Sequence, residues 1–365
     1  MIALRVLLFL AGATVVLVAV RSVLRTFVVP RALRAVLPRA VFIGVRRVFR
    51  LRAGERHDYA IRDRVMAYYA PVALVTLLVV WVAILLAGFT AMFFALGRLG
   101  VVDAFRFAGS AMFTLGFARR NEAPFILLDF VAAGTGLVFL ALFITYLPSL
   151  YGGFQRRERG VAKLEVRAGQ PPTGVYLIEL AWVVGRLETL KGLWAEWEDW
   201  FTDVDESHSA LPMLVFFRSG HPDQSWITAA GAILDGASLF DSTVDVPRMP
   251  EPQFMIRSGY LCLRHIADFF QIPVDHDPKP DDPISIEREE FDAVYDRLDA
   301  SGVPVRADRD QCWRDFAGWR VNYDAPLVGL ARLTMAPPAP WSSDRYEDAH
   351  FIPPVFPRLR RDGGG

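Results

Sequence analysis

The sequence predicts an all-α membrane protein with three transmembrane helices, a short re-entrant helix between the second and third, and an all-α cytosolic C-terminal domain. Two observations carry this prediction. Hydrophobic residues fill 53% of the 365 positions and the mean hydropathy is +0.27, both high for a soluble protein. Three long apolar segments lie within the first 154 residues, and no later segment is long enough to span a bilayer.

The first apolar segment covers residues 6–20 and is expected to be an uncleaved anchor within residues 1–29. It is apolar apart from Thr14, and Arg5 and Arg21 flank it. A cleaved signal peptide is the alternative. No small-x-small cleavage site precedes Arg21, and the arginines that follow would resist export, so we favour the anchor.

The second and third apolar segments are predicted to span the membrane. Residues 65–97 carry no charge, and residues 125–154 carry only Asp129. Both exceed the roughly 20 residues that a spanning helix needs. Together they define a membrane domain at 65–154.

The arginines fix the expected orientation. Residues 21–64 contain twelve arginines against three acidic side chains, and positively charged segments stay on the cytoplasmic side of a membrane. The N-terminus is therefore expected outside and everything after residue 154 in the cytosol. The arginine-rich composition, with only three lysines, indicates a GC-rich bacterial genome and hence a bacterial inner membrane.

Residues 30–64 mix these arginines with aliphatic and aromatic side chains at roughly helical spacing. This pattern predicts an interfacial helix that lies along the cytoplasmic leaflet and contacts anionic lipids. Nucleic-acid binding by the same arginines is the alternative, but the interleaved aliphatic side chains and the flanking spans favour lipid.

The segment at 103–120 is too short to cross the bilayer. Asp103 stands at a possible helix start, residues 104–113 predict a short helix, and a glycine-containing turn follows at 114–118. A polar outer end then carries Arg119, Arg120 and Glu122. Irregular backbone in lipid leaves amides unpaired at a cost of several kcal/mol each, so other protein must shield such a loop. The C-terminal end of its helix carries partial negative charge, which favours a cation.

Residues 104–118, AFRFAGSAMFTLGFA, resemble without a gap the pore helix and filter of tetrameric potassium channels, whose filter reads Thr-Val-Gly-Tyr-Gly, or Gly-Phe-Gly in some members. The filter-like positions are Thr114, Leu115, Gly116, Phe117 and Ala118. The resemblance covers about a third of the chain, roughly 41–159. It implies a homotetramer with 65–97 as the outer helix, 125–154 as the inner helix, a monovalent cation such as potassium as the permeant ion, and no cofactor.

Two positions depart from the channel pattern. Ala118 replaces the second glycine, whose left-handed backbone angles alanine adopts only at a cost of ~1 kcal/mol or more. Arg119 replaces an aspartate, and with Arg120 it would place eight positive charges at the outer mouth of a tetramer unless Asp103 or Glu122 pairs with them. A cation channel, an anion or non-selective pore, and a non-conducting membrane sensor or scaffold therefore all remain open.

Three residues of the inner helix are candidates for gating. Gly134 and Gly136 would allow flexing in its first half, and Pro148 removes a helical hydrogen bond near its cytoplasmic end. The alternative is that glycine and proline are simply frequent in membrane helices.

The cytosolic part is expected to form a helical regulatory domain at 155–336, followed by a proline- and glycine-rich extended tail at 337–365. Apolar residues recur at three-then-four spacing over 180–204, which predicts a buried helix of a bundle or, less favoured, a coiled coil. Further helical patterns lie at 225–240, 252–270, 286–298 and 310–333. Residues 206–239 resemble the cytosolic part of uncharacterised actinobacterial channel-like proteins, which implies no particular ligand.

No catalytic motif is present. GxSxG, HExxH, GxxxxGK[ST] and GxGxxG are all missing, so we expect no enzyme and no catalytic residue. The acidic loop at 275–283 fits no known cation-binding pattern and is interpreted as a solvated linker, so no metal site is expected. Cys262 and Cys312 predict buried reduced thiols. Three histidines, His208, His221 and His265, are candidate pH or metal sensors but are more simply surface or packed residues.

Overall fold

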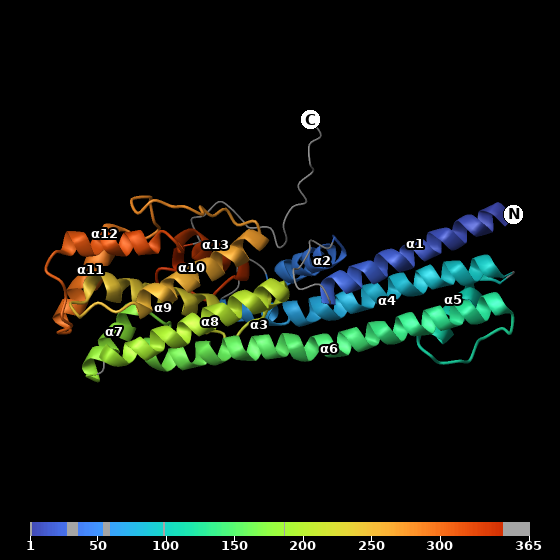
Figure 1. The fold of residues 1–365 in the computed structure, drawn as a ribbon, viewed down its shortest axis with the longest axis horizontal. Coiled ribbons are helices and arrows are strands. Elements are labelled where there is room, and N and C mark those ends of the chain that lie inside the picture. Colours follow the sequence, from blue (N-terminus) through green and yellow to red (C-terminus); the bar gives the residue numbers. More distant parts are fainter. Residues whose placement is uncertain (1, 28–35, 54–58, 98, 186, 346–365) are drawn as a thin grey trace, which may run out of the picture. The chain divides into compact units, whose positions relative to one another are not determined.

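The computed structural model describes residues 2–27, 36–53, 59–97, 99–185 and 187–345, and over these residues the protein is all-α (Figure 1). An isolated bridge between Val244 and Val305 is the only β-type pairing in the described ranges. The first six helices are α1 (Ile2–Phe27), α2 (Val36–Ala53), α3 (Tyr59–Ala67), α4 (Tyr69–Leu96), α5 (Val101–Met112) and α6 (Ala123–Ala168). The later ones are α7 (Gly174–Val183), η1 (Leu187–Thr189), α8 (Leu190–Ala210), η2 (Pro212–Phe216), α9 (Trp226–Thr243), α10 (Glu251–Phe269), α11 (Arg288–Ala300), α12 (Arg309–Arg320), α13 (Asp324–Thr334) and η3 (Ser343–Arg345).

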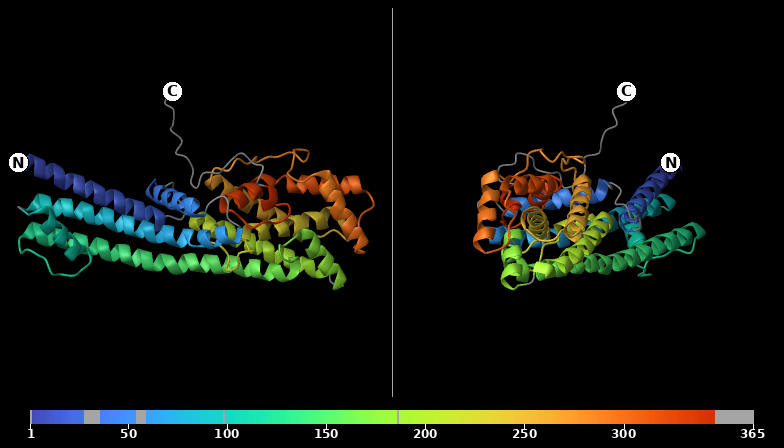
Figure 2. Two further views of the ribbon diagram at one scale, coloured as in Figure 1. Left: turned by 180° about the vertical axis from the view of Figure 1, so that it is seen from behind. Right: turned by 60° about the vertical axis from the view of Figure 1, so that its left-hand side comes forward.

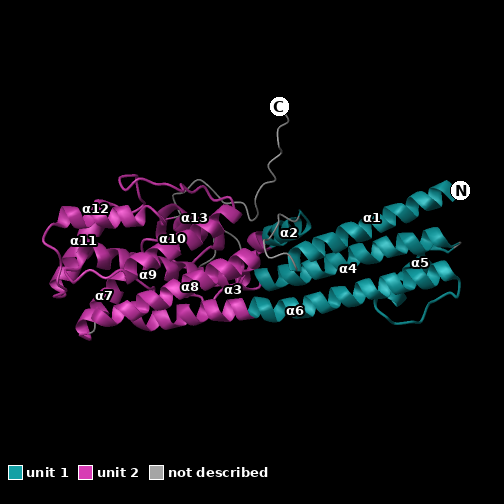
Figure 3. Ribbon diagram, in the orientation of Figure 1, with its two compact units in different colours: residues 1–48, 69–151 teal, residues 49–68, 152–365 magenta. Residues whose placement is uncertain are grey.

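The chain divides into two compact units, which Figure 3 colours separately. Unit 1 consists of residues 1–48 and 69–151, and unit 2 of residues 49–68 and 152–365. Helix α6 runs without interruption from the first unit into the second.

Three helical segments are long and apolar enough to cross a membrane, so this is a membrane protein with three candidate spans. They are Ile2–Phe27, Tyr59–Leu96 and Ala123–Ala168. Each is longer than the span expected from its apolar core, because helices continue into the polar flanks. The second is broken between α3 and α4, where Pro71 lacks the amide that would bond the Ala67 carbonyl and its ring crowds that carbonyl.

Helix α1 packs directly on α4 within unit 1 (Figure 1). The two backbones meet at a pair of glycines: a Cβ on Gly12 would lie 2.7 Å from the Gly88 carbonyl oxygen, and one on Gly88 would lie 2.7 Å from a Val16 methyl carbon. Small residues at such crossings let membrane helices approach closely. Helix α1 is therefore packed into unit 1. That it is an uncleaved anchor stays a prediction.

An aromatic cluster joins the three long helices. Phe27 of α1 lies with its ring centroid 5.2 Å from that of Trp81 on α4 and 4.6 Å from that of Tyr146 on α6. Trp81 also meets Phe139 of α6 edge-on, and its indole N–H donates to the Ser22 hydroxyl. Such aromatic pairs contribute about 0.5–1.5 kcal/mol each beyond their area.

Helix α9 is the centre of unit 2. All but one of its eighteen residues are buried, and helices α7, α10, α12 and α13 pack around it. Small side chains allow the close approach: a Cβ on Gly174 of α7 would lie 2.3 Å from the Gly236 amide nitrogen of α9.

A buried polar cluster ties the last helices to α9. The Arg320 guanidinium, with no exposed surface, donates to Asp235 at 2.6 Å, to Asp324 at 2.7 Å and to the Trp341 carbonyl at 2.6 Å. The Tyr323 hydroxyl also donates to Asp235. Because each of these charges has partners, we interpret the cluster as a structural contact that holds the last helices on α9.

The helical patterns expected after residue 220 are confirmed as α9, α10, α11 and the pair α12 and α13. Two expectations were wrong. The pattern at 180–204 is not one helix, because Gly185 adopts a left-handed φ of 68° and separates α7 from η1 and α8. Residues 337–345 are not an extended tail: Trp341 stacks 5.5 Å from Phe316, and η3 follows. The rest of the tail, 346–365, lies outside the described residues.

Candidate functional site

Helix α5 is the short helix expected between the second and third spans. Asp103 stands in its first turn, where a carboxylate favours the positive end of a helix. One face is buried and packs on α4; it consists of Ala104, Ala108, Ser110, Ala111 and Met112. The rings of Phe93, Phe107 and Phe125 meet at centroid distances of 5.9–6.2 Å and join α4, α5 and the start of α6.

The C-terminal end of α5 lies against α6. A Cβ on Gly136 would lie only 2.0 Å from the Met112 carbonyl oxygen, whereas a Cβ on Gly134 would meet nothing within 4 Å. Gly136 is therefore a packing residue that lets the last turn of α5 reach the α6 backbone. Helix α6 continues through Gly134, Gly136 and Pro148 in this structure. Their role in gating stays a prediction.

The filter-like loop follows α5 and leads to the start of α6 (Figure 2), and its amides return to the last turns of α5. Thr114 has a φ of 56° and Gly116 a φ of 69°. Ala118 is not among the residues with positive φ, so the strain expected for alanine at this position is not present. The left-handed position that costs energy is instead Thr114, a β-branched residue for which such angles are unusual.

Buried Ser110 holds this loop. Its carbonyl oxygen accepts from the amides of Leu115 at 2.8 Å and Gly116 at 3.3 Å, and its hydroxyl accepts from the Ala118 amide at 3.0 Å. The Thr114 amide donates to the Ala111 carbonyl. Sequence reasoning did not identify Ser110, although a serine amid the alanines of the buried face was a usable signal.

In this hydrogen-bonding pattern the loop keeps free carbonyl acceptors but few free amide donors. Four of its amides, those of Thr114, Leu115, Gly116 and Ala118, are engaged by α5. The carbonyls of residues 114–118 accept no hydrogen bond from the rest of the described chain. A loop of this kind presents oxygen atoms, which are ligands for a cation, and withholds most of the amides that would bind an anion.

The side chains of the loop face away from the unit. Leu115 is 63% exposed and Phe117 61% exposed. The exposed apolar side chains of α6 lie on a face that no described residue of unit 1 covers; they include Leu127, Phe130, Val131, Leu137, Val138 and Leu140. This face is available to lipid or to further copies of the chain.

The charged outer end is arranged differently from the expectation. Asp103 pairs with Arg106 at 3.8 Å, and both are exposed. The Arg120 guanidinium lies 5.2 Å from the centroid of the Phe125 ring, a cation–π contact. Within the described ranges neither Arg119 nor Arg120 forms an ion pair, so neither Asp103 nor Glu122 neutralises them inside one chain.

The interfacial helix expected within 30–64 is α2, and its first residues, 30–35, lie outside the described ranges. Phe42 is not available to lipid: it is fully buried, its ring meets Tyr69 edge-on, and its carbonyl accepts from the Tyr69 hydroxyl. Val36, Arg47 and Val48 remain exposed. Contact with anionic lipids stays a prediction.

In unit 2 the titratable residues singled out from the sequence do not converge. Cys262 and Cys312 are buried and free, as expected. His208 is buried, whereas His221 is exposed and His265 pairs at the surface with Asp205 at 2.9 Å. Within the described ranges, no three His, Cys, Asp or Glu side chains form a group that could hold a metal ion.

No known protein family matches this chain, and neither a curated protein nor a solved structure does. The resemblance of residues 104–118 to potassium channels therefore stays a prediction from the sequence.

Proposed function

We propose that this protein is a potassium-channel-like subunit that conducts monovalent cations through a tetrameric pore, with Thr114, Leu115, Gly116, Phe117 and Ala118 forming the filter-like ring. The observation that carries the proposal is the hydrogen bonding of this loop: four of its five amides are bound inward by Ser110 and Ala111, and its carbonyls have no partner among the described residues. Carbonyl rings of this kind replace the hydration shell of a permeant cation.

The tetramer is part of the proposal because the loop cannot stand alone in lipid. An irregular backbone with unpaired carbonyls is tolerated at membrane depth only where protein surrounds it or where it lines a water-filled cavity. Three further copies would supply that surrounding, with the uncovered apolar face of α6 as the contact. The arginines of residues 21–64 favour a bacterial inner membrane with unit 2 in the cytoplasm as a regulatory domain.

The arginines at the outer end favour a second candidate, an anion or non-selective pore or a non-conducting scaffold. In a tetramer, Arg119 and Arg120 without carboxylate partners would form a positive field that repels cations.

Measurements of ion flux distinguish the cation channel from the second candidate. The full-length protein is reconstituted in liposomes, and potassium, sodium and chloride gradients are compared, with the oligomeric state checked by native mass. We expect cation flux that Gly116→Asp abolishes, because a carboxylate at this position would bind the ion and the side chain strains the turn. The matched control is Gly185→Asp, at a glycine of unit 2 with nearly the same φ and with equally open surroundings.

The result that would overturn the proposal is chloride-selective flux, or flux of any ion that survives Gly116→Asp. An Arg119→Asp variant measured in the same assay is expected to raise the ratio of cation to anion permeability.

A further inference from the structure

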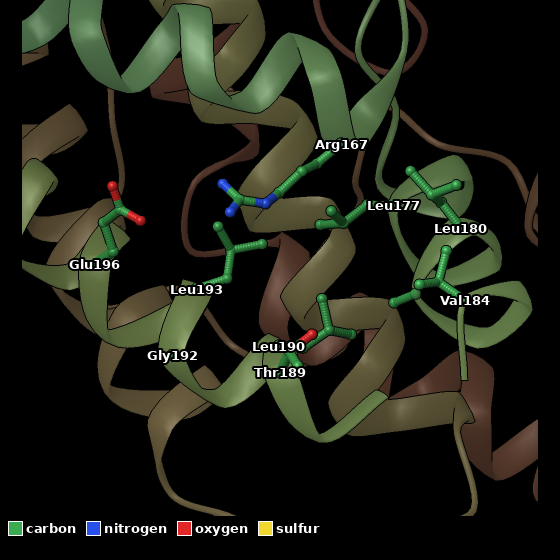
Figure 4. A pocket seen from close by; sticks show the side chains of 10 residues that line it. Arg167, Leu177, Leu180, Val184, Thr189, Leu190, Gly192, Leu193 and Glu196 are labelled. Atoms are coloured by element: carbon green, nitrogen blue, oxygen red, sulfur yellow. The ribbon is translucent and has the colours of Figure 1, made fainter. Parts of the chain in front are cut away.

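A cavity of about 380 Å³ lies inside unit 2, where the last turn of α6 meets α7, η1 and the start of α8 (Figure 4). The proposed pore uses none of the residues that line this cavity. Its volume falls in the range of small-molecule sites in proteins.

The wall of this cavity is mostly aliphatic. Leu177 of α7 and Leu190 and Leu193 of α8 are buried and form its floor, while Val184 is exposed at its rim. An apolar cavity open to solvent favours an apolar ligand body, because each methylene group removed from water contributes about 0.8 kcal/mol.

The side chain of Arg167 is a cation that faces this apolar wall. In Figure 4 the side chain of Arg167, from the last turn of α6, reaches over Leu177 and Leu193. The Arg167 guanidinium makes no hydrogen bond or ion pair with the described part of the chain. The carboxylate of Glu196, which also borders the cavity, is already paired with Lys163. Among the described residues that line it, the cavity therefore offers the unpaired positive charge of Arg167 beside an aliphatic floor.

We propose that this cavity binds a small amphipathic carboxylate, with the carboxylate on Arg167 and the apolar body on Leu177, Leu190 and Leu193. Guanidinium groups bind carboxylates with two parallel hydrogen bonds, which fixes the head group. At about 30 Å³ per water-sized group, the volume holds a ligand of roughly a dozen non-hydrogen atoms. This is the size of a medium-chain fatty acid or an aryl-alkanoate. The site does not depend on whether the protein conducts ions.

The test measures binding to the full-length protein in lipid nanodiscs by equilibrium dialysis, with empty nanodiscs subtracted. The probes are octanoate, octanol and octylammonium, which share one chain and differ in charge. We expect octanoate to bind at least tenfold more tightly than octanol and octylammonium not to bind. In Arg167→Gln the preference for octanoate is lost while octanol binding is unchanged.

Two further variants locate the site. Ala181→Trp places an indole in the cavity from α7 and is expected to remove the binding of both octanoate and octanol. Arg159→Gln, at an exposed arginine earlier on the same helix and outside the cavity, is expected to change nothing. Equal affinity for octanoate and octanol, or an octanoate preference that survives Arg167→Gln, would overturn the proposal. Arg167 is exposed, so Arg167→Gln is expected to fold and keeps the test decisive even if Ala181→Trp does not fold.

Discussion

His208 is held in a neutral form by its surroundings. Its Nδ1 lies 2.9 Å from the Val204 carbonyl, and its Nε2 lies 3.3 Å from Nη1 of Arg157. A carbonyl only accepts and a guanidinium only donates, so the proton sits on Nδ1 and Nε2 is the acceptor. Burial and then the Arg157 charge lower the pKa of His208 well below its usual 6.5.

A histidine with a lowered pKa in the folded state makes stability depend on pH. Below about 6.5 the unfolded chain takes up a proton that the folded chain does not, so stability falls on acidification by up to about 1.4 kcal/mol per pH unit. We expect the midpoint of chemical unfolding, followed by tryptophan fluorescence, to decrease between pH 7 and pH 5. The dependence should weaken in His208→Gln.

His221→Gln is the matched control, because this histidine is exposed. If the slope of stability against pH is the same in His208→Gln as in the wild type, the titrating group is another one.

At the scale of elements, the close contact between α5 and α6 gives two neighbouring glycines opposite roles. Gly136→Ala forces its Cβ onto the Met112 carbonyl, so the backbone of one helix must shift, at a cost of about 1–3 kcal/mol. Gly134→Ala meets open space and gains helix propensity. We expect a lower thermal midpoint in nanodiscs for Gly136→Ala and an equal or higher one for Gly134→Ala. An equal decrease in thermal midpoint in both variants would show that the glycines supply hinge flexibility and not close packing.

The helices themselves were largely predictable from the sequence, because apolar runs and 3.6-residue periodicity act locally. The breaks between helices were less predictable from the sequence. The sequence pattern at 180–204 continues across Gly185, and only the backbone angle at that glycine ends α7. Pro71 divides α3 from α4 inside an uncharged run that reads as one span.

The candidate site was predictable as a stretch of sequence but not as a set of contacts. Residues 114–118 carry the filter-like pattern, whereas the role of Ser110 depends on how the loop returns over α5. The cavity beside Arg167 was not predictable, because it joins residues from α6, α7 and α8 whose approach depends on tertiary packing.

At the scale of the whole molecule, unit 2 holds the helical segment that precedes the second span and the one that follows the third. Arg157, on the extension of α6, donates to the carbonyls of Leu214 at 2.7 Å and Phe217 at 2.6 Å. On the segment before the second span, Asp63 of α3 pairs with Arg218. These contacts hold α3 and the C-terminal extension of α6 within unit 2.

Arg218 is the place to test this arrangement. Its guanidinium binds Asp63 and also the carbonyls of Thr334 at 2.8 Å and Met335 at 3.1 Å. Arg218→Gln removes the charge, and charged hydrogen bonds contribute about 1.5–3 kcal/mol. We expect hydrogen exchange of the α3 amides to accelerate tenfold or more.

Arg257→Gln, at an exposed arginine of α10, is the control for loss of a charge. If α3 exchanges equally slowly in Arg218→Gln and Arg257→Gln, the segment is held by its other contacts and the arginine is dispensable.

The glycine contact between α1 and α4 can form only after α4 has been synthesised. Gly12 emerges from the ribosome before Gly88, and the arginine-rich segment lies between them. At typical translation rates of about 5–20 residues per second, the first helix waits roughly 4–15 seconds for its partner. During that time its narrow stripe of Gly12, Val16 and Ala19 faces lipid, so α1 must be stable in the bilayer alone. A mean hydropathy of 2.5 over its most apolar 18 residues allows this.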